Sequence, residues 1–234
     1  MSIETKNPLG EQPVNRLLSQ FAIPSIISML VGSLYNIVDQ FFIGQRVGEL
    51  GNAATNIAFP LSTSCLALAL LIGIGGSSAF NLAMGSGDDK KAVHLLGNAV
   101  VLLAGSGLFL SIITFLFLKP LLLFFGSPKA VLPFAIEYTK VTAFGFPFLL
   151  LGTGGGHLIR ADGRPRMTMV CNLIGAVNNT VLDALFVFGL NLGMTGAALA
   201  TVIGQMVSGI MAIICLMHGK TVSIHKEHLF VKWE

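Results

Sequence analysis

Residues 53–84 read AATNIAFPLSTSCLALALLIGIGGSSAFNLAM and contain no charged side chain. An apolar run of this length is typical of a helix that crosses a lipid bilayer, which needs about 20 such residues. Together with five further long apolar runs it gives six predicted helices, at residues 17–44, 53–84, 92–118, 131–157, 167–190 and 194–217. Nothing argues for strands, so we predict an all-α polytopic membrane protein.

The composition of the whole chain supports a membrane protein. Of its 234 residues, 53% are hydrophobic and 11% are charged, whereas soluble domains carry about 25% charged residues. This argues against a cytosolic enzyme, a secreted disulfide scaffold and a disordered region. Each of Cys65, Cys171 and Cys215 lies inside a predicted span, so we infer no disulfide and no metal site.

Lysine and arginine are unevenly distributed between the two sides of the predicted bundle. Ten lie in the N-terminal segment, the second and fourth loops and the tail, while Arg46, Lys119, Lys129 and Lys140 lie opposite. Because positive loops stay in the cytoplasm, we predict a cytoplasmic segment at 1–16, a six-helix unit at 17–217 and a cytoplasmic tail at 218–234. The basic residues form no patch, so the net charge of +3 does not indicate a nucleic-acid partner.

Only two carboxylates, Asp39 and Asp183, fall clearly within predicted helices, each near the outer end. An aspartate at a helix centre costs about 2.5–3.5 kcal/mol, so such residues are rarely present without a use. Helical geometry puts Asn172, Asn179 and Asp183 on one stripe of the fifth helix. The alternative is an aspartate that reaches the outer interface or bonds a helix end.

Further polar side chains share faces of the other helices. Carboxylate, amide and hydroxyl oxygens suit a hard cation such as Na⁺, and they can equally hold a proton. The alternative is that the amides and hydroxyls only join helices by hydrogen bonds. The further residues are Tyr35 and Asn36 near Asp39, Asn56 in the second helix, and Thr201 with Gln205 in the sixth. Pro24, Pro60 and Pro147 lie inside spans and permit bending.

The aspartate contexts do not match an intramembrane aspartyl protease, which needs Tyr-Asp and Gly-x-Gly-Asp settings. Here the contexts are Val38-Asp39-Gln40 and Leu182-Asp183-Ala184. A serine protease would need Ser77 or Ser78 near a buried histidine, and no predicted span supplies one centrally. We therefore predict that the chain is not an enzyme.

A weak internal repeat relates the first and fifth helices. Val38–Gly44, followed by Gly48, resembles Leu182–Gly189, followed by Gly193, with one more residue between Asp and Gly in the second copy. Helices 1–2 and 5–6 therefore look like two copies of one hairpin running in the same direction.

Three stretches resemble the multidrug and toxic compound extrusion (MATE) family of transporters, and most of all its prokaryotic branch typified by DNA-damage-inducible protein F. They are Val38–Gly44, the loop Leu158–Arg166, and Asn178–Gly189 running into Gly196–Thr201. The resemblance implies one lobe of a twelve-helix transporter, the amino-terminal one, with the inter-lobe linker starting in the tail. It also implies a cation site at Asp39, Asn179, Asp183 and Thr201.

The expected function is that of an antiporter in the cytoplasmic membrane, with both termini in the cytoplasm, that couples Na⁺ or H⁺ entry to export of amphipathic or cationic organic compounds. Apart from the coupling ion we expect no cofactor; the partners are the bilayer, the substrate and a carboxy-terminal lobe or second copy. We expect the substrate cavity to be lined by Tyr35, Asn36, Asn56, Asn172 and Gln205, with Pro24 as a hinge.

Two alternatives to this function stay open. One is an inactive or structural half-lobe that needs a partner lobe. The other is a lipid-linked saccharide flippase, which would need cationic side chains for the pyrophosphate, and no Arg or Lys falls clearly within a predicted span.

Overall fold

The computed structural model describes residues 13–219, and every element within that range is a helix. The predicted segment at 1–16 and tail at 218–234 lie largely outside the described residues. The elements are α2 (Val14–Arg46), α3 (Glu49–Gly85), α4 (Asp89–Leu116), α5 (Leu118–Phe124), α6 (Leu132–Thr142), the 3₁₀ helix η1 (Ala143–Gly145), α7 (Phe146–Ala161), α8 (Pro165–Asp183), the π-helix η2 (Ala184–Gly189) and α9 (Gly193–Met217).

Six helical segments of the described chain are long and apolar enough to cross a membrane, which confirms the predicted all-α fold. They are Leu18–Arg46, Glu49–Gly85, Asp89–Leu116, Leu132–Ala161, Pro165–Gly189 and Gly193–Met217. The fourth segment is composite, because α6 and α7 are joined through η1.

Two predicted loops are wrong in extent. The loop predicted at Gln45–Asn52 consists only of Val47 and Gly48. Gly48 has φ of 82°, and its carbonyl oxygen accepts hydrogen bonds from the backbone N–H groups of Gly51 and Asn52, which already belong to α3. A left-handed glycine lets the chain reverse within two residues. The segment between the predicted helices 92–118 and 131–157, expected to be a loop, contains α5, which is held by the fully buried side chain of Leu122.

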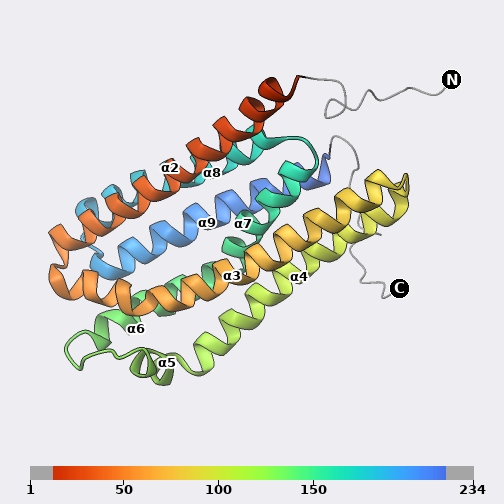
Figure 1. Cartoon of the computed structure of the whole chain (residues 1–234). Helices are drawn as coiled ribbons and strands as arrows, with labels where there is room; N and C mark the ends of the chain where they lie inside the picture. The colour runs from red at the N-terminus through yellow and green to blue at the C-terminus, as the bar shows by residue number, and fades with distance from the viewer. Residues whose placement is uncertain (1–12, 220–234) are drawn as a thin grey trace.

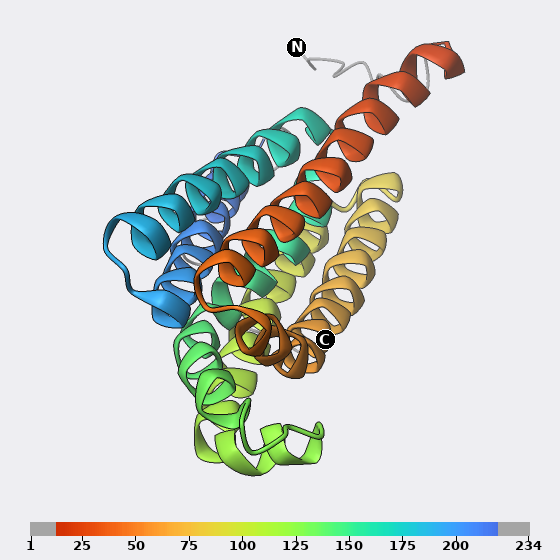
Figure 2. The ribbon, with the colours of Figure 1, turned by 90° about the vertical axis from the view of Figure 1, so that its left-hand side faces the viewer.

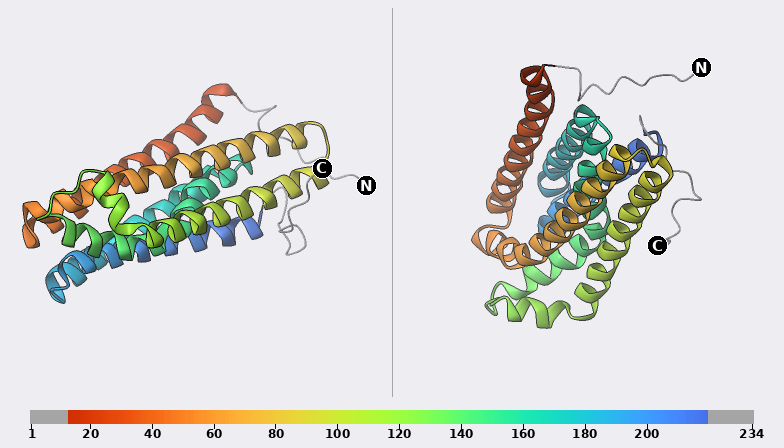
Figure 3. Two further views of the ribbon diagram at one scale, coloured as in Figure 1. Left: turned by 90° about the horizontal axis from the view of Figure 1, so that it is seen from below. Right: turned by 45° about the vertical axis from the view of Figure 1, so that its right-hand side comes forward.

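The helix α7 lies in the middle of the bundle, in contact with α3, α4 and α9, while α2 stands at the edge and packs mainly on α8 (Figures 1 and 3). Small residues let the central helices approach closely. A Cβ built on Gly175 of α8 would lie 3.1 Å from the Gly204 carbonyl oxygen of α9. Such contacts replace the hydrophobic effect as the cohesive force between helices in lipid.

One end of the bundle carries the α2–α3 and α8–α9 turns, and Figure 2 views the molecule from this end. Side chains join the elements here: Arg46 donates to Asn191, and Glu137 of α6 accepts from the backbone N–H of Thr195 at 3.1 Å. The opposite end carries the α3–α4 and α7–α8 turns (Figure 1). The first turns of α2 and the last turns of α9 lie at this opposite end as well, as an even number of spans requires.

The repeat seen in the sequence explains the π-helical turn. Gly44 follows Asp39 by five positions in α2, whereas Gly189 follows Asp183 by six. The stretch after Asp183 is the π-helix η2. One extra residue within a helical turn produces a π-bulge, so η2 accommodates the additional residue of the second copy.

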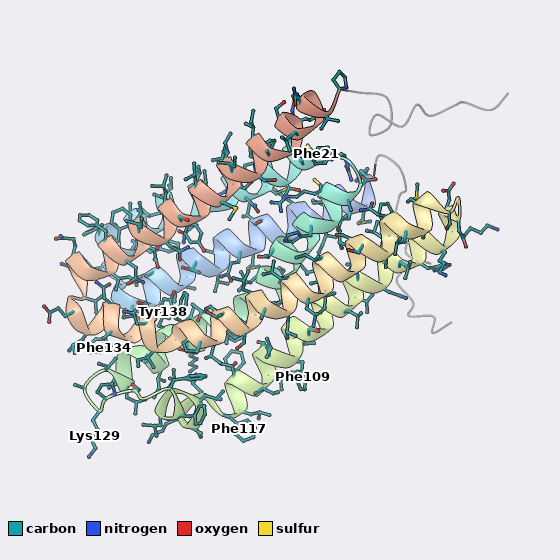
Figure 4. The ribbon with its side chains drawn as sticks, viewed as in Figure 1. Phe21, Phe109, Phe117, Lys129, Phe134 and Tyr138 are labelled. Atoms are coloured by element: carbon teal, nitrogen blue, oxygen red, sulfur yellow. The ribbon has the colours of Figure 1, made fainter. Side chains whose placement is uncertain are left out.

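Large apolar side chains cover the outside of the bundle. Phe109 and Phe117, labelled in Figure 4, are 61% and 53% exposed. An apolar exterior of this kind suits contact with lipid tails or with another apolar protein surface.

Candidate functional site

Asp39 of α2 and Asp183 of α8 are buried in the half of the bundle that carries the α8–α9 turn. Their exposed fractions are 6% and 0%, and the Oδ1 atom of each has no hydrogen-bond partner. The two carboxylates also interact electrostatically. Neither side chain is exposed on the surface of the described bundle, and a proton or a cation would satisfy the unpaired oxygens.

Asn179 connects Asp183 to α9. It lies one helical turn before Asp183 on the same stripe, and 3% of it is exposed. When the side-chain amide is oriented so that both its N–H and its oxygen have hydrogen-bond partners, Nδ2 donates to Asp183 Oδ2 at 3.2 Å. In the same orientation, Oδ1 accepts from the backbone N–H of Thr201 at 3.2 Å. The close approach of Gly204 to the Asn179 backbone makes this contact between helices possible.

Tyr138 was not among the residues predicted from the sequence, although it is one of only two tyrosines in the chain. Its phenol interacts with both aspartates and with the side chain of Thr201. Figure 4 shows Tyr138 where α6 meets the first half of α9. Tyr138 is the single tyrosine of its apolar span, and this feature of the sequence could have identified the residue.

A cavity of about 210 Å³ adjoins this carboxylate pair. Among the residues expected at a substrate cavity, Tyr35, Asn172 and Gln205 line this one, together with Asn179 and Thr201. No residue of its lining carries a formal charge. The remaining lining residues are Ser28 and Gly32 of α2, Phe148, Leu149, Gly152 and Thr153 of α7, Gly175 and Ala176 of α8, and Gly204 and Ser208 of α9.

Asn36 and Asn56 are not brought to this cavity. Asn36 is exposed and donates to the Gly32 carbonyl of its own helix at 2.7 Å. Asn56 is also exposed, and its neighbour Thr55 is the side chain that turns inward, where it bonds Gln40 at 2.9 Å. A side chain next to a predicted lining position points about 100° away from it.

Pro24 lies inside α2, which continues without a break from Val14 to Arg46. It borders a second hollow, of about 650 Å³, between α2 and the α7–α8 turn, where Arg164 and Arg166 contribute to the lining. The structure shows a single shape of α2, so the hinge role of Pro24 stays a prediction.

The described residues contain no cluster of three or more His, Cys, Asp or Glu side chains that could hold a metal ion. A bound Na⁺ would therefore depend on neutral oxygens. Besides the two carboxylates, Asn179 is the neutral side chain in hydrogen-bond contact with Asp183, at 3.2 Å.

The known proteins that resemble this chain are membrane transporters. The chain is 26% identical over 219 residues to the multidrug export protein MepA of Staphylococcus haemolyticus, covering 93% of this chain and 48% of that protein. It is 28% identical over 210 residues to an FAD transporter of Shewanella oneidensis, covering 88% and 46%. The chain thus spans about half the length of these relatives.

Solved transporter structures also resemble this chain, again over about half of their own length. The outward-facing conformation of a multidrug resistance MATE family transporter of the MOP superfamily superposes with a TM-score of 0.84 at 26% identity, over 92% of this chain and 48% of that one. The MatE family model matches residues 24–185, which include Asp39, Asn179 and Asp183. The chain therefore belongs to the MatE family of membrane transporters.

Proposed function

We propose that the chain is one lobe of a cation-coupled antiporter that exports amphipathic or cationic organic compounds across the cytoplasmic membrane. The observation that carries the proposal is the buried pair Asp39 and Asp183, each with an unpartnered oxygen, beside a polar cavity. Ionisable groups inside a membrane protein mark ion and proton pathways.

The carboxylate pair would act as the ion switch. Two carboxylates that interact in a low dielectric cannot both stay ionised without a compensating cation. They would take up a proton or Na⁺ as a coupled unit. Because Tyr35, Asn179 and Thr201 line the cavity next to this pair, a change in its charge would alter the hold of the cavity on a substrate.

Asn179 offers a way to distinguish the two coupling ions. Its amide oxygen accepts from Thr201 and its N–H faces Asp183, which suits a carboxylate held by hydrogen bonds. Binding of Na⁺ between Asn179 and Asp183 would require the amide to turn its oxygen toward the ion. A proton requires no such rotation, and the imposed H⁺ and Na⁺ gradients described below distinguish the two ions.

A second lobe is part of the proposal. The cavity volume of about 210 Å³ is below the roughly 300–1,000 Å³ that accommodates drug-sized ligands. Alternating access also needs one bundle to rock against another around the site. A carboxy-terminal lobe, or a second copy of this chain, would supply the opposite wall.

The proposed orientation places both termini in the cytoplasm. Lys90, Lys91, Arg160, Arg164 and Arg166 belong to the α3–α4 and α7–α8 regions, at the same end of the described bundle (Figure 1). Retention of positive loops in the cytoplasm would direct this end inward. No lining residue of the cavity is cationic, so nothing at this site favours a lipid-linked saccharide flippase.

The test is transport by the chain reconstituted in proteoliposomes with a carboxy-terminal lobe, under imposed H⁺ or Na⁺ gradients. Because the relatives include a multidrug exporter and an FAD transporter, the substrates are a cationic dye and FAD. We expect Asp183→Asn to abolish ion-coupled export of the dye without loss of folding, since an amide is cheaper to bury than a carboxylate.

Asp39→Asn should weaken the same coupling, and Asp89→Asn is the matched control because Asp89 is exposed at the start of α4. Unchanged coupling in both Asp39→Asn and Asp183→Asn would show that the carboxylate pair is structural. Strong export by the six-helix chain without any second lobe, independent of protein concentration, would contradict the need for two walls.

A further inference from the structure

Two of the three cysteines are brought together by the fold. The Sγ atoms of Cys171 in α8 and Cys215 in α9 lie 3.9 Å apart, and the residues are 2% and 8% exposed. Both are free thiols in the structure, as is Cys65 in α3. The pair is separated by 44 positions in the sequence, and neither thiol belongs to the carboxylate pair or the cavity lining.

We propose that Cys171 and Cys215 form a dithiol site at which a peroxide-class oxidant creates a disulfide between α8 and α9. A disulfide requires an S–S distance of about 2.04 Å. The two sulfur atoms must therefore approach by about 1.9 Å.

Contacts on both sides of the pair hold the two helices in place. Arg164, directly before α8, donates to the carbonyl oxygens of Cys215 at 2.7 Å and His218 at 3.0 Å. At the other side of the pair, Gly175 and Gly204 let the two helices meet within van der Waals contact. The disulfide therefore joins segments that the fold has already positioned, which limits the strain of closure.

The chemistry needs only the two thiols and the oxidant. The sulfur of Cys215, which is the more exposed, attacks one oxygen of hydrogen peroxide and the O–O bond breaks. The departing hydroxide takes up the thiol proton, so a sulfenic acid and one water form. The sulfur of Cys171 then attacks the sulfenic sulfur, the S–S bond forms, and the hydroxyl leaves as a second water with the Cys171 proton. The peroxide is reduced and the protein loses two hydrogen atoms.

Intact-mass spectrometry on the full chain in detergent or lipid, before and after hydrogen peroxide, tests the proposal. We expect a loss of two hydrogen atoms, a fall in free thiols from three to the one of Cys65, and proteolytic fragments of α8 and α9 that separate only after reduction. Cys171→Ser and Cys215→Ser should each prevent the link, whereas Cys65→Ala should leave it intact. None of these measurements depends on transport.

A designed pair shows whether the oxidant enters the bundle. A Cβ built on Gly152 would lie 3.6 Å from the Cβ of Ser208, within the 3.5–4.5 Å range of disulfides. Gly152→Cys with Ser208→Cys, in a chain that also carries Cys171→Ser and Cys215→Ser, should therefore close under the same treatment. Closure of the designed pair while the native pair keeps its thiols, or gains oxygen without a link, would overturn the proposal.

Discussion

A close contact between α3 and α7 depends on the absence of a side chain at Gly73. A Cβ built on this residue would lie 2.7 Å from the Cα and 2.8 Å from the carbonyl oxygen of Gly154. These are backbone atoms, so rotamer changes cannot relieve the contact. Gly73→Ala must displace one helix against the other, and α7 is also held by α4 and α9.

The size of the effect follows from that geometry. Ordinary contact begins at 3.4 Å, so the helices must separate by about 0.7 Å, and overpacking of this kind costs about 1–3 kcal/mol. Gly75→Ala is the matched control, because nothing lies within 4 Å of its Cβ position. Both substitutions gain about 1 kcal/mol of helix propensity, so the difference between the two variants isolates the contact.

The assay is the free energy of unfolding of the purified chain in a denaturing detergent titration, followed by far-ultraviolet circular dichroism. We expect Gly73→Ala to be less stable than Gly75→Ala by about 1–3 kcal/mol. Equal stability of the two variants would refute the close α3–α7 contact as a determinant of the fold.

Two further predictions concern the α7–α8 turn. The guanidinium of Arg164 lies 2.7 Å from the buried carboxylate of Asp162, so Arg164→Gln should destabilise the chain by about 3–5 kcal/mol. The same detergent titration measures the free energy of unfolding of this variant. A loss no larger than that of the exposed control Arg166→Gln would contradict a stabilising role of the ion pair. The second prediction concerns the orientation of the chain in the membrane. In a chain without the native cysteines, Arg166→Cys should react with a membrane-impermeant thiol reagent only after cells are permeabilised. Labelling in intact cells would contradict the proposed cytoplasmic location of this turn.

The stripes of polar residues within single helices could be predicted from the sequence. The spacing of Asn172 and Asn179 in α8, and of Thr201 and Gln205 in α9, fixes a shared face because an α-helix repeats every 3.6 residues. The structure places all four in the cavity lining. The same arithmetic could not say which face of α2 or α3 turns inward, so Asn36 and Asn56 were expected at the cavity but lie on exposed surfaces.

The sequence by itself determined that the chain is a bundle of six membrane helices with two carboxylates inside it, since apolar run length and the cost of burying charge are local properties. Only the tertiary structure decided which side chains meet across helices. The contact from Asn179 to Thr201, the position of Tyr138 and the pairing of Cys171 with Cys215 all depend on the rotation and separation of neighbouring helices. Those are set by small-residue packing between backbones, such as Gly175 against Gly204, and no periodicity within one helix encodes them.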